Sequence, residues 1–131
     1  MKSWMKAAAL GLAVTGFGAG AALADPVLGT WKTQVDDGNY AHVKMQKCGQ
    51  KICGTIAKAF NAQGPMNTEN LGKKLVWAMV PAGDGYYKSG KIWQPSTDKI
   101  YRSKMTLSGN TLKVSGCVGP ICKKQTWSRV N

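Results

Sequence analysis

Near the end of the chain, residues 100–130 read IYRSKMTLSGNTLKVSGCVGPICKKQTWSRV. Two short segments of turn-forming residues, 108–110 and 119–120, divide this sequence into three runs. Alternate positions of the runs place one set of side chains on a common face: Tyr101, Ser103, Met105, Leu107, Leu112, Val114, Trp127 and Arg129. A period of two residues is typical of β-strands, and short turns between such strands predict antiparallel hairpins.

The same pattern extends toward the N-terminus. Further strands are predicted at 28–35, 40–46, 52–60, 75–80 and 86–94, and residues 61–72 form the longest irregular stretch. Eight short strands joined mostly by hairpins predict an all-β sandwich or barrel. We favour a small antiparallel up-and-down β-barrel of about eight strands, because closure of the sheet leaves no exposed edge. A barrel of this size is either filled by side chains or holds one small ligand.

The first residues, 1–24, have the features of a secretory signal peptide that is cleaved from the mature protein. Lys2 and Lys6 give a positive start, an uncharged stretch follows, and Ala22-Leu23-Ala24 has the form of a cleavage site. The alternative is a membrane anchor, but the stretch is short for a span and rich in Ala and Gly. We therefore expect an exported protein, periplasmic or secreted, with one domain at 25–131 and no later membrane-spanning segment.

The size and charge of the chain limit the classes of function. Removing 24 of the 131 residues leaves 107, and removing Lys2 and Lys6 lowers the net charge from +12 to +10. This is one small domain with a modest core. A single histidine, His42, and a single glutamate leave little material for acid–base catalysis, so we expect no enzyme. The lysines are spread along the strands, which favours a solvated outer surface or attraction to anionic partners over nucleic-acid binding.

The four cysteines form two pairs with the same spacing, Cys48 with Cys53 and Cys117 with Cys122. Residues five apart can lie opposite each other in a hairpin, close enough for a disulfide, so two local bridges are the preferred interpretation. A four-cysteine zinc site and a redox-active dithiol are the alternatives. An exported location favours the disulfides.

Aromatic side chains are frequent in the mature chain, and they either fill the barrel or line a ligand cavity. Positions along the predicted strands suggest five lining residues, and the long loop adds two that would lie at the mouth of the cavity. The predicted ligand-binding residues are Trp77, Tyr86, Trp93, Tyr101, Met105, Asn67 and Asn70. We find no cluster of His and carboxylates for a metal, no catalytic set and no motif for a cofactor.

The two ends of the barrel sequence resemble the calycin pattern of lipocalins and their relatives. Gly29-Thr30-Trp31 opens the first strand and Trp127-Ser128-Arg129 closes the last one. This resemblance implies that Arg129 packs on Trp31, with Gly29 and Trp127 beside them, and closes one end of the barrel. An arginine can stack on an indole and donate to free carbonyl groups at the same time.

The mature chain as a whole resembles the DUF2147 family of exported bacterial proteins, which implies a lipocalin-like barrel but no established activity. The matching segments are GTW at 29–31, CG at 48–49, ICG at 52–54, GKIWQP at 90–95, KIY at 99–101, LKVSG at 112–116 and TWSR at 126–129. The family often carries an Asp-x-x-Asn element in its long loop, where this chain has Asn67-Thr68-Glu69-Asn70.

Together these features predict an exported, non-enzymatic, lipocalin-like protein that binds a small hydrophobic ligand in the barrel. The alternative is a cell-envelope protein whose basic surface contacts anionic lipids or polymers. A hydrolase or isomerase in a barrel pocket is the third and weakest hypothesis. The sequence predicts no oligomeric state.

Overall fold

The computed structural model describes residues 24–131, so the predicted signal peptide, apart from its last residue, lies outside the described part. Nine strands and no helix make up the regular structure of these residues. The strands are β2 (Gly29–Lys32), β3 (Tyr40–Cys48), β4 (Lys51–Asn61), β5 (Gly64–Met66), β6 (Lys74–Pro81), β7 (Tyr86–Gln94), β8 (Lys99–Ser108), β9 (Thr111–Val118) and β10 (Ile121–Arg129).

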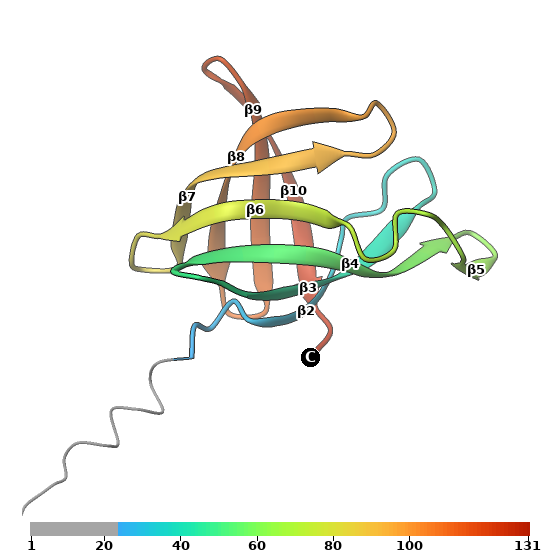
Figure 1. The fold of residues 1–131 in the computed structure, drawn as a ribbon, viewed down its shortest axis with the longest axis horizontal. Helices are drawn as coiled ribbons and strands as arrows, with labels where there is room; N and C mark the ends of the chain where they lie inside the picture. The colour runs from blue at the N-terminus through green and yellow to red at the C-terminus, as the bar shows by residue number, and fades with distance from the viewer. Residues whose placement is uncertain (1–23) are drawn as a thin grey trace, which may run out of the picture.

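Eight of the strands form a closed antiparallel barrel (Figure 1). Each strand pairs with its neighbours along the chain, except that the short β5 only extends β4 and the barrel continues from β4 to β6. Pairing of β10 with β2 and of β3 with β4 closes the sheet. The predicted fold class, a small up-and-down β-barrel of eight strands, is therefore confirmed.

Two boundaries differ from the sequence prediction. The first strand ends at Lys32 rather than at residue 35, and the loop that follows bends across one end of the barrel. The stretch 61–72, predicted to be irregular, contains β5. Both differences occur at the same end of the barrel, where the long connections 33–39, 62–73 and 95–98 gather with the β9–β10 turn. We call this the open end; its three long connections face right in Figure 1, whereas the β9–β10 turn projects at the top.

The opposite end, which we call the closed end, contains the hydrophobic core. Its largest fully buried side chains are Trp31, Trp127, Met45, Ile52, Met79, Met105 and Leu112. Two glycines allow the walls to approach each other there. A Cβ atom on Gly54 would lie 2.7 Å from Val43 Cγ1, and one on Gly90 would overlap the Met79 side chain. The core thus fills one half of the barrel and leaves the other half available for a site.

The structure contains both predicted disulfides, Cys48–Cys53 and Cys117–Cys122. Cys117 lies directly opposite Cys122, with 4.0 Å between the Cα atoms. Cys48 instead pairs with Lys51, so its bond to Cys53 runs diagonally across the hairpin, over 5.9 Å between Cα atoms. The expected direct opposition is therefore wrong for this first pair, because the turn is centred on residues 49–50 and shifts the register by one pair.

Two features concern membranes and metals. Within residues 24–131, no helix is long and apolar enough to cross a membrane. The same part of the chain contains no group of three or more His, Cys, Asp or Glu side chains that could hold a metal ion.

Candidate functional site: a cavity at the open end of the barrel

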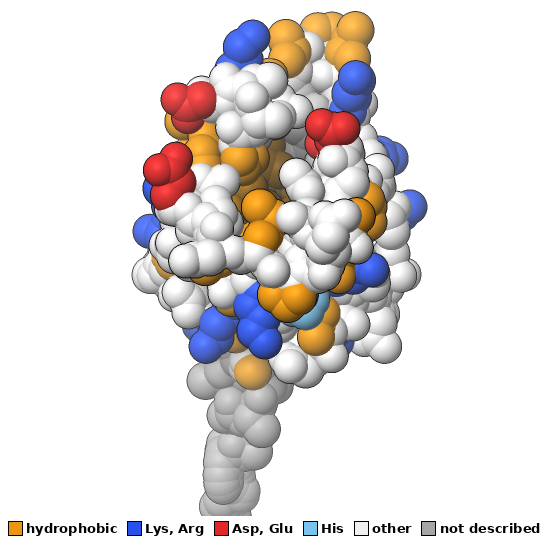
Figure 2. Space-filling model, turned by 90° about the vertical axis from the view of Figure 1, so that its right-hand side faces the viewer, with side chains coloured by type: hydrophobic (Ala, Val, Ile, Leu, Met, Phe, Trp, Pro, Cys, Tyr) orange, Lys and Arg blue, Asp and Glu red, His pale blue; other side chains and the backbone are white. Residues whose placement is uncertain are grey.

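The open end of the barrel contains a cavity of about 1180 Å³. Figure 2 looks toward this end and shows a hollow with hydrophobic atoms inside and acidic side chains around its edge. Pockets for drug-sized molecules usually measure about 300–1000 Å³. The space is therefore large enough for a small ligand.

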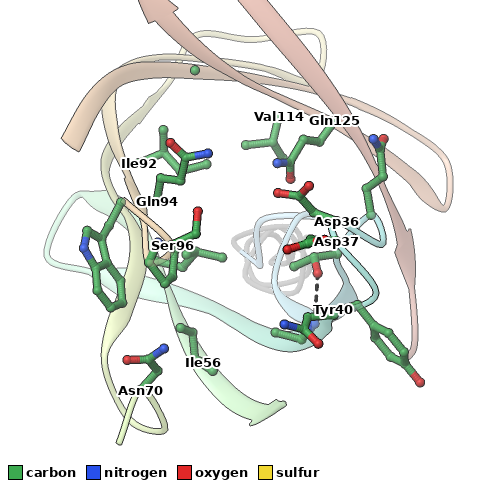
Figure 3. Close-up of a pocket in the computed structure, with 18 of the residues that line it drawn as sticks. Asp36, Asp37, Tyr40, Ile56, Asn70, Ile92, Gln94, Ser96, Val114 and Gln125 are labelled. Carbon is green, nitrogen blue, oxygen red and sulfur yellow. Dashed lines mark hydrogen bonds between the residues drawn. The ribbon is translucent and has the colours of Figure 1, made fainter. Parts of the chain in front are cut away.

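The inner wall of the cavity is apolar. Ile56 of β4, Ile92 of β7 and Val114 of β9 point inward from three different strands (Figure 3). Val114 is fully buried, and its strand partner on β10 is Gln125. Gly116 follows on the same face of β9. A Cβ atom at this position would lie 3.5 Å from Ile92 Cγ2, which is an ordinary van der Waals distance. This wall can bury the apolar body of a ligand.

Three glutamines are among the hydrogen-bonding side chains of the lining, together with Thr, Asn, Ser, Asp, Tyr and Lys side chains. Gln125 Oε1 accepts a 2.9 Å bond from the indole nitrogen of the fully buried Trp127. Gln94 Oε1 accepts from the Tyr101 hydroxyl at 3.4 Å and from Thr97. Gln34, in the loop after β2, accepts at its Oε1 from the Thr126 amide at 2.9 Å. The side-chain amide oxygens of all three glutamines thus accept hydrogen bonds from other groups of the protein.

The lining of the cavity carries a balanced set of charges. Asp36 and Asp37 come from the loop after β2, and Lys123 and Lys124 from β10. The two acidic and two basic side chains give the lining no net charge, although the chain as a whole has a net charge of +12. The cavity therefore does not share the positive character of the outer surface.

Three of the seven predicted ligand-binding residues line the cavity, namely Trp93, Tyr101 and Asn70. Trp93 is fixed at the edge: its indole nitrogen donates to Asp98 Oδ1 at 2.8 Å, and the Lys73 ammonium lies 5.5 Å from the ring centroid. Tyr101 bonds to Gln94 inside the cavity. These three residues remain predicted ligand contacts.

The other four predicted residues lie elsewhere, and their expected place in the lining is corrected. Trp77 pairs with the exposed Lys91 on the outer face of the barrel, and Tyr86 is 39% exposed beside Thr106. Met105 points inward but belongs to the core of the closed end, and Asn67 is exposed in the long loop. The prediction for Trp77 and Tyr86 rested on their aromatic character. It is wrong because side chains alternate along a strand, and here the neighbouring Val76 and Tyr87 point into the barrel.

The polar lining residues that the sequence did not predict include three glutamines, Gln34, Gln94 and Gln125. Gln125 lies two residues before the buried Trp127, and Gln94 lies two residues after the inward-facing Ile92. The period of two along a strand would have placed both side chains inside the barrel. These polar groups were not predicted, because the predicted strand residues of the lining were chosen for their apolar or aromatic character.

At the closed end, the four predicted closure residues form one cluster. The Arg129 guanidinium lies 4.4 Å from the centroid of the Trp31 ring. Its nitrogens donate to the carbonyl oxygens of Leu28, at 3.1 Å, and Pro26. Gly29 has a φ of +124°, and a Cβ there would lie 2.5 Å from the Asn131 carbonyl oxygen. Trp127 is fully buried in the adjoining core, so the cluster closes this end of the barrel.

The chain segment before β2 completes the closure. Trp31 donates through its indole nitrogen to the Val27 carbonyl at 2.9 Å, and Val27 is fully buried. The Tyr87 hydroxyl donates to Asp25 Oδ1. Burial and this bond raise the pKa of the Tyr87 phenol, so it stays protonated at neutral pH. The segment 25–28 therefore packs against this end of the barrel.

His42 does not line the cavity itself, but it packs beside two residues that do, Tyr40 and Phe60. It packs against Phe60 at 4.7 Å between ring centroids, and Phe60 stacks on Tyr40 at the same distance. Partial burial, together with the nearby Lys58 and Lys32, lowers the pKa of His42. The histidine is thus neutral at physiological pH and part of an aromatic cluster.

Comparisons with known proteins agree with this fold. The profile of a family described as "Uncharacterized protein conserved in bacteria (DUF2147)" matches residues 29–129. Among solved structures, the chain is similar to the protein HP1028 from the human pathogen Helicobacter pylori, which is described as belonging to the lipocalin family. The TM-score is 0.64 at 18% identity, over 80% of this chain and 83% of that one. No curated protein matches the chain. The structural likeness shows a lipocalin-like barrel.

Proposed function

The chain belongs to the DUF2147 family, and from this premise and its lipocalin-like barrel we propose that it binds a small, mainly hydrophobic molecule at the open end. The observation that carries the proposal is the cavity of about 1180 Å³ with an apolar inner wall. Burial of apolar surface contributes roughly 25 cal/mol per Å². A small apolar molecule in this cavity would therefore gain several kcal/mol.

We also propose that the protein binds its ligand without chemical conversion. Support comes from the position of His42, which does not line the cavity itself but packs behind Phe60, a residue of the lining. The carboxylates of Asp36 and Asp37 lie in a loop at the mouth, and within residues 24–131 neither is bonded through its side chain to a Ser, Cys or His nucleophile or base. The proposed location, periplasmic or secreted, rests on the leader sequence alone.

Titration with an apolar dye such as N-phenylnaphthylamine tests ligand binding. Its fluorescence should rise in a saturable way at one site per chain. Gly116→Trp should weaken binding at least tenfold, because the backbone there accepts a Cβ without strain and the ring would extend beside Ile92. Thr106→Trp, on the exposed outer face of β8, is the matched control and should bind like the wild type. Absence of saturable binding, or equal binding by both variants, would refute the proposal.

A second candidate function is contact with an anionic lipid surface through the tip of the β9–β10 hairpin. The hairpin projects from the barrel (Figure 1), and its Val118 and Ile121 are 66% and 70% exposed. The Cys117–Cys122 disulfide holds the tip, and Lys123 and Lys124 follow on β10. An apolar tip beside basic residues suits insertion among acidic head groups.

Vesicle sedimentation separates this candidate from cavity binding. The protein should sediment with phosphatidylglycerol vesicles at low salt but not with phosphatidylcholine vesicles. Val118 and Ile121 also adjoin the cavity, so the two sites are separated by a pair of variants: Val118→Ser/Ile121→Ser should lose sedimentation, whereas Gly116→Trp, which fills the cavity, should keep it. If the double variant sediments like the wild type, the tip is not the contact surface.

A further inference from the structure

We infer that the ligand carries an uncharged hydrogen-bond acceptor, of the carbonyl type, at the end that enters the barrel. This inference rests on the proposed binding of a small molecule in the cavity and adds the chemistry of its polar group. It follows from the glutamine side chains of the lining. Within residues 24–131 their amide oxygens accept hydrogen bonds from the protein, whereas their amide nitrogens donate none to it.

The orientations of two side-chain amides, those of Gln125 and Gln34, are fixed by nitrogen groups that can only donate a hydrogen bond. The Trp127 indole nitrogen can only donate, so the amide oxygen of Gln125 must face it. The Thr126 backbone nitrogen likewise requires the oxygen of Gln34. In Gln94 the oxygen accepts from the hydroxyls of Tyr101 and Thr97. In all three side chains the amide oxygen therefore already accepts at least one hydrogen bond from the protein.

The amide nitrogens of the same side chains are the groups left for a ligand. Among the hydrogen bonds formed within residues 24–131, none uses Nε2 of Gln34, Gln94 or Gln125. Figure 3 shows Gln94 and Gln125 reaching into the cavity from different walls. Both side chains are half-buried, and a half-buried donor without a partner favours a ligand that accepts from it. Gln125 lies beside Val114 on the apolar wall, so its NH₂ group meets the deepest part of a ligand.

The charges of the lining decide between a neutral and an ionised acceptor. Asp36 and Asp37 would repel a carboxylate, whereas Lys123 and Lys124 would repel an amine. Because the lining has no net charge, its attraction for a carboxylate or an ammonium group does not offset the hydration free energy that the ion loses on leaving water. A ketone, ester or amide carbonyl satisfies the NH₂ groups without that loss.

Displacement of the bound dye by four molecules of matched length tests the inference: methyl hexyl ketone, octane, octylamine and octanoate. One hydrogen bond corresponds to roughly 1 kcal/mol, so the ketone should bind about fivefold to tenfold more tightly than octane once each affinity is divided by the alkane–water partition coefficient of the compound. It should also bind more tightly than the amine and the carboxylate. If octane equals the ketone on this scale, or if either ion binds most tightly, the inference is wrong while dye binding still supports the proposed function. If neither the dye nor any of the four molecules binds, the proposed function itself fails.

Substitution of Gln125 identifies the donor. Gln125→Glu keeps an oxygen for Trp127 but replaces the NH₂ group by an acceptor, so at pH 8 it should abolish the preference for the ketone over octane. Gln125→Met has no donor at any pH and should do the same. Gln46→Glu, on an exposed position of β3, makes the same charge change and should keep the preference. Retention of the preference in both Gln125 variants would overturn the assignment, provided that their thermal unfolding is cooperative.

Discussion

Replacement of Arg129 should open the closed end of the barrel and lower its stability. The guanidinium stacks on Trp31 and donates to three oxygens, those of Leu28, Pro26 and the Asn110 side chain. The three hydrogen bonds together contribute about 2 kcal/mol, because two of them are exposed to water, and the stacking contributes about 1 kcal/mol. Arg129→Met should therefore lower the free energy of unfolding by about 3 kcal/mol. Arg129→Lys keeps the charge but not the planar fork, and should lower it by about 2 kcal/mol.

Urea unfolding followed by tryptophan fluorescence measures this loss. With a slope of about 1 kcal/mol per M for a domain of this size, the midpoint for Arg129→Met should fall by about 3 M. Arg102→Met is the control, because Arg102 donates to a single carbonyl, that of Gly119, at the exposed hairpin turn. A loss below about 1 kcal/mol for Arg129→Met, or an equal loss in the control, would refute the role of Arg129 in closure.

Three further predictions concern the core, the histidine and the disulfides. Gly54→Ala should lower stability by about 1–3 kcal/mol in thermal unfolding, because its Cβ would lie 2.7 Å from Val43 Cγ1; a change within error would mean that the wall can move. Since the pKa of His42 is lowered in the folded state, the protein should lose stability as the pH falls below 6.5, and His42→Gln should flatten this dependence. A steeper pH dependence in the variant would contradict this prediction, because it would mean that folding raises the pKa of His42. Reduction should cost about 2 kcal/mol for each disulfide, and non-reducing peptide mapping should give only Cys48–Cys53 and Cys117–Cys122; a crossed pair would contradict the structure.

The barrel could be predicted from the sequence because its signals are local. Alternation along residues 100–130 and the turns between the strands are properties of neighbouring residues, and the observed β8, β9 and β10 follow them closely. The closure by Arg129 and Trp31 joins the two ends of the chain, and only the family resemblance indicated it. The spacing of the cysteines predicted both bridges, but not that Cys48 and Cys53 bond diagonally.

The cavity was harder to predict because it depends on which side chains a strand turns inward and how far the core extends. Met105 has the correct phase, but it lies in the filled half of the barrel, a fact that only the packed structure reveals. Ala78 and Ser89 have positive φ angles of 59° and 62° within β6 and β7, where the ladders are irregular. Such irregularities interrupt simple alternation, and no single residue in the sequence marks them.

The most direct test of ligand binding in the barrel is a crystal structure of the protein with methyl hexyl ketone. We expect the alkyl chain between Ile92 and Val114, with the carbonyl oxygen within hydrogen-bonding distance of Gln125 Nε2. Density for the ketone only on the outer face, or an open end filled by rearranged side chains, would contradict the proposal that this barrel holds a small molecule.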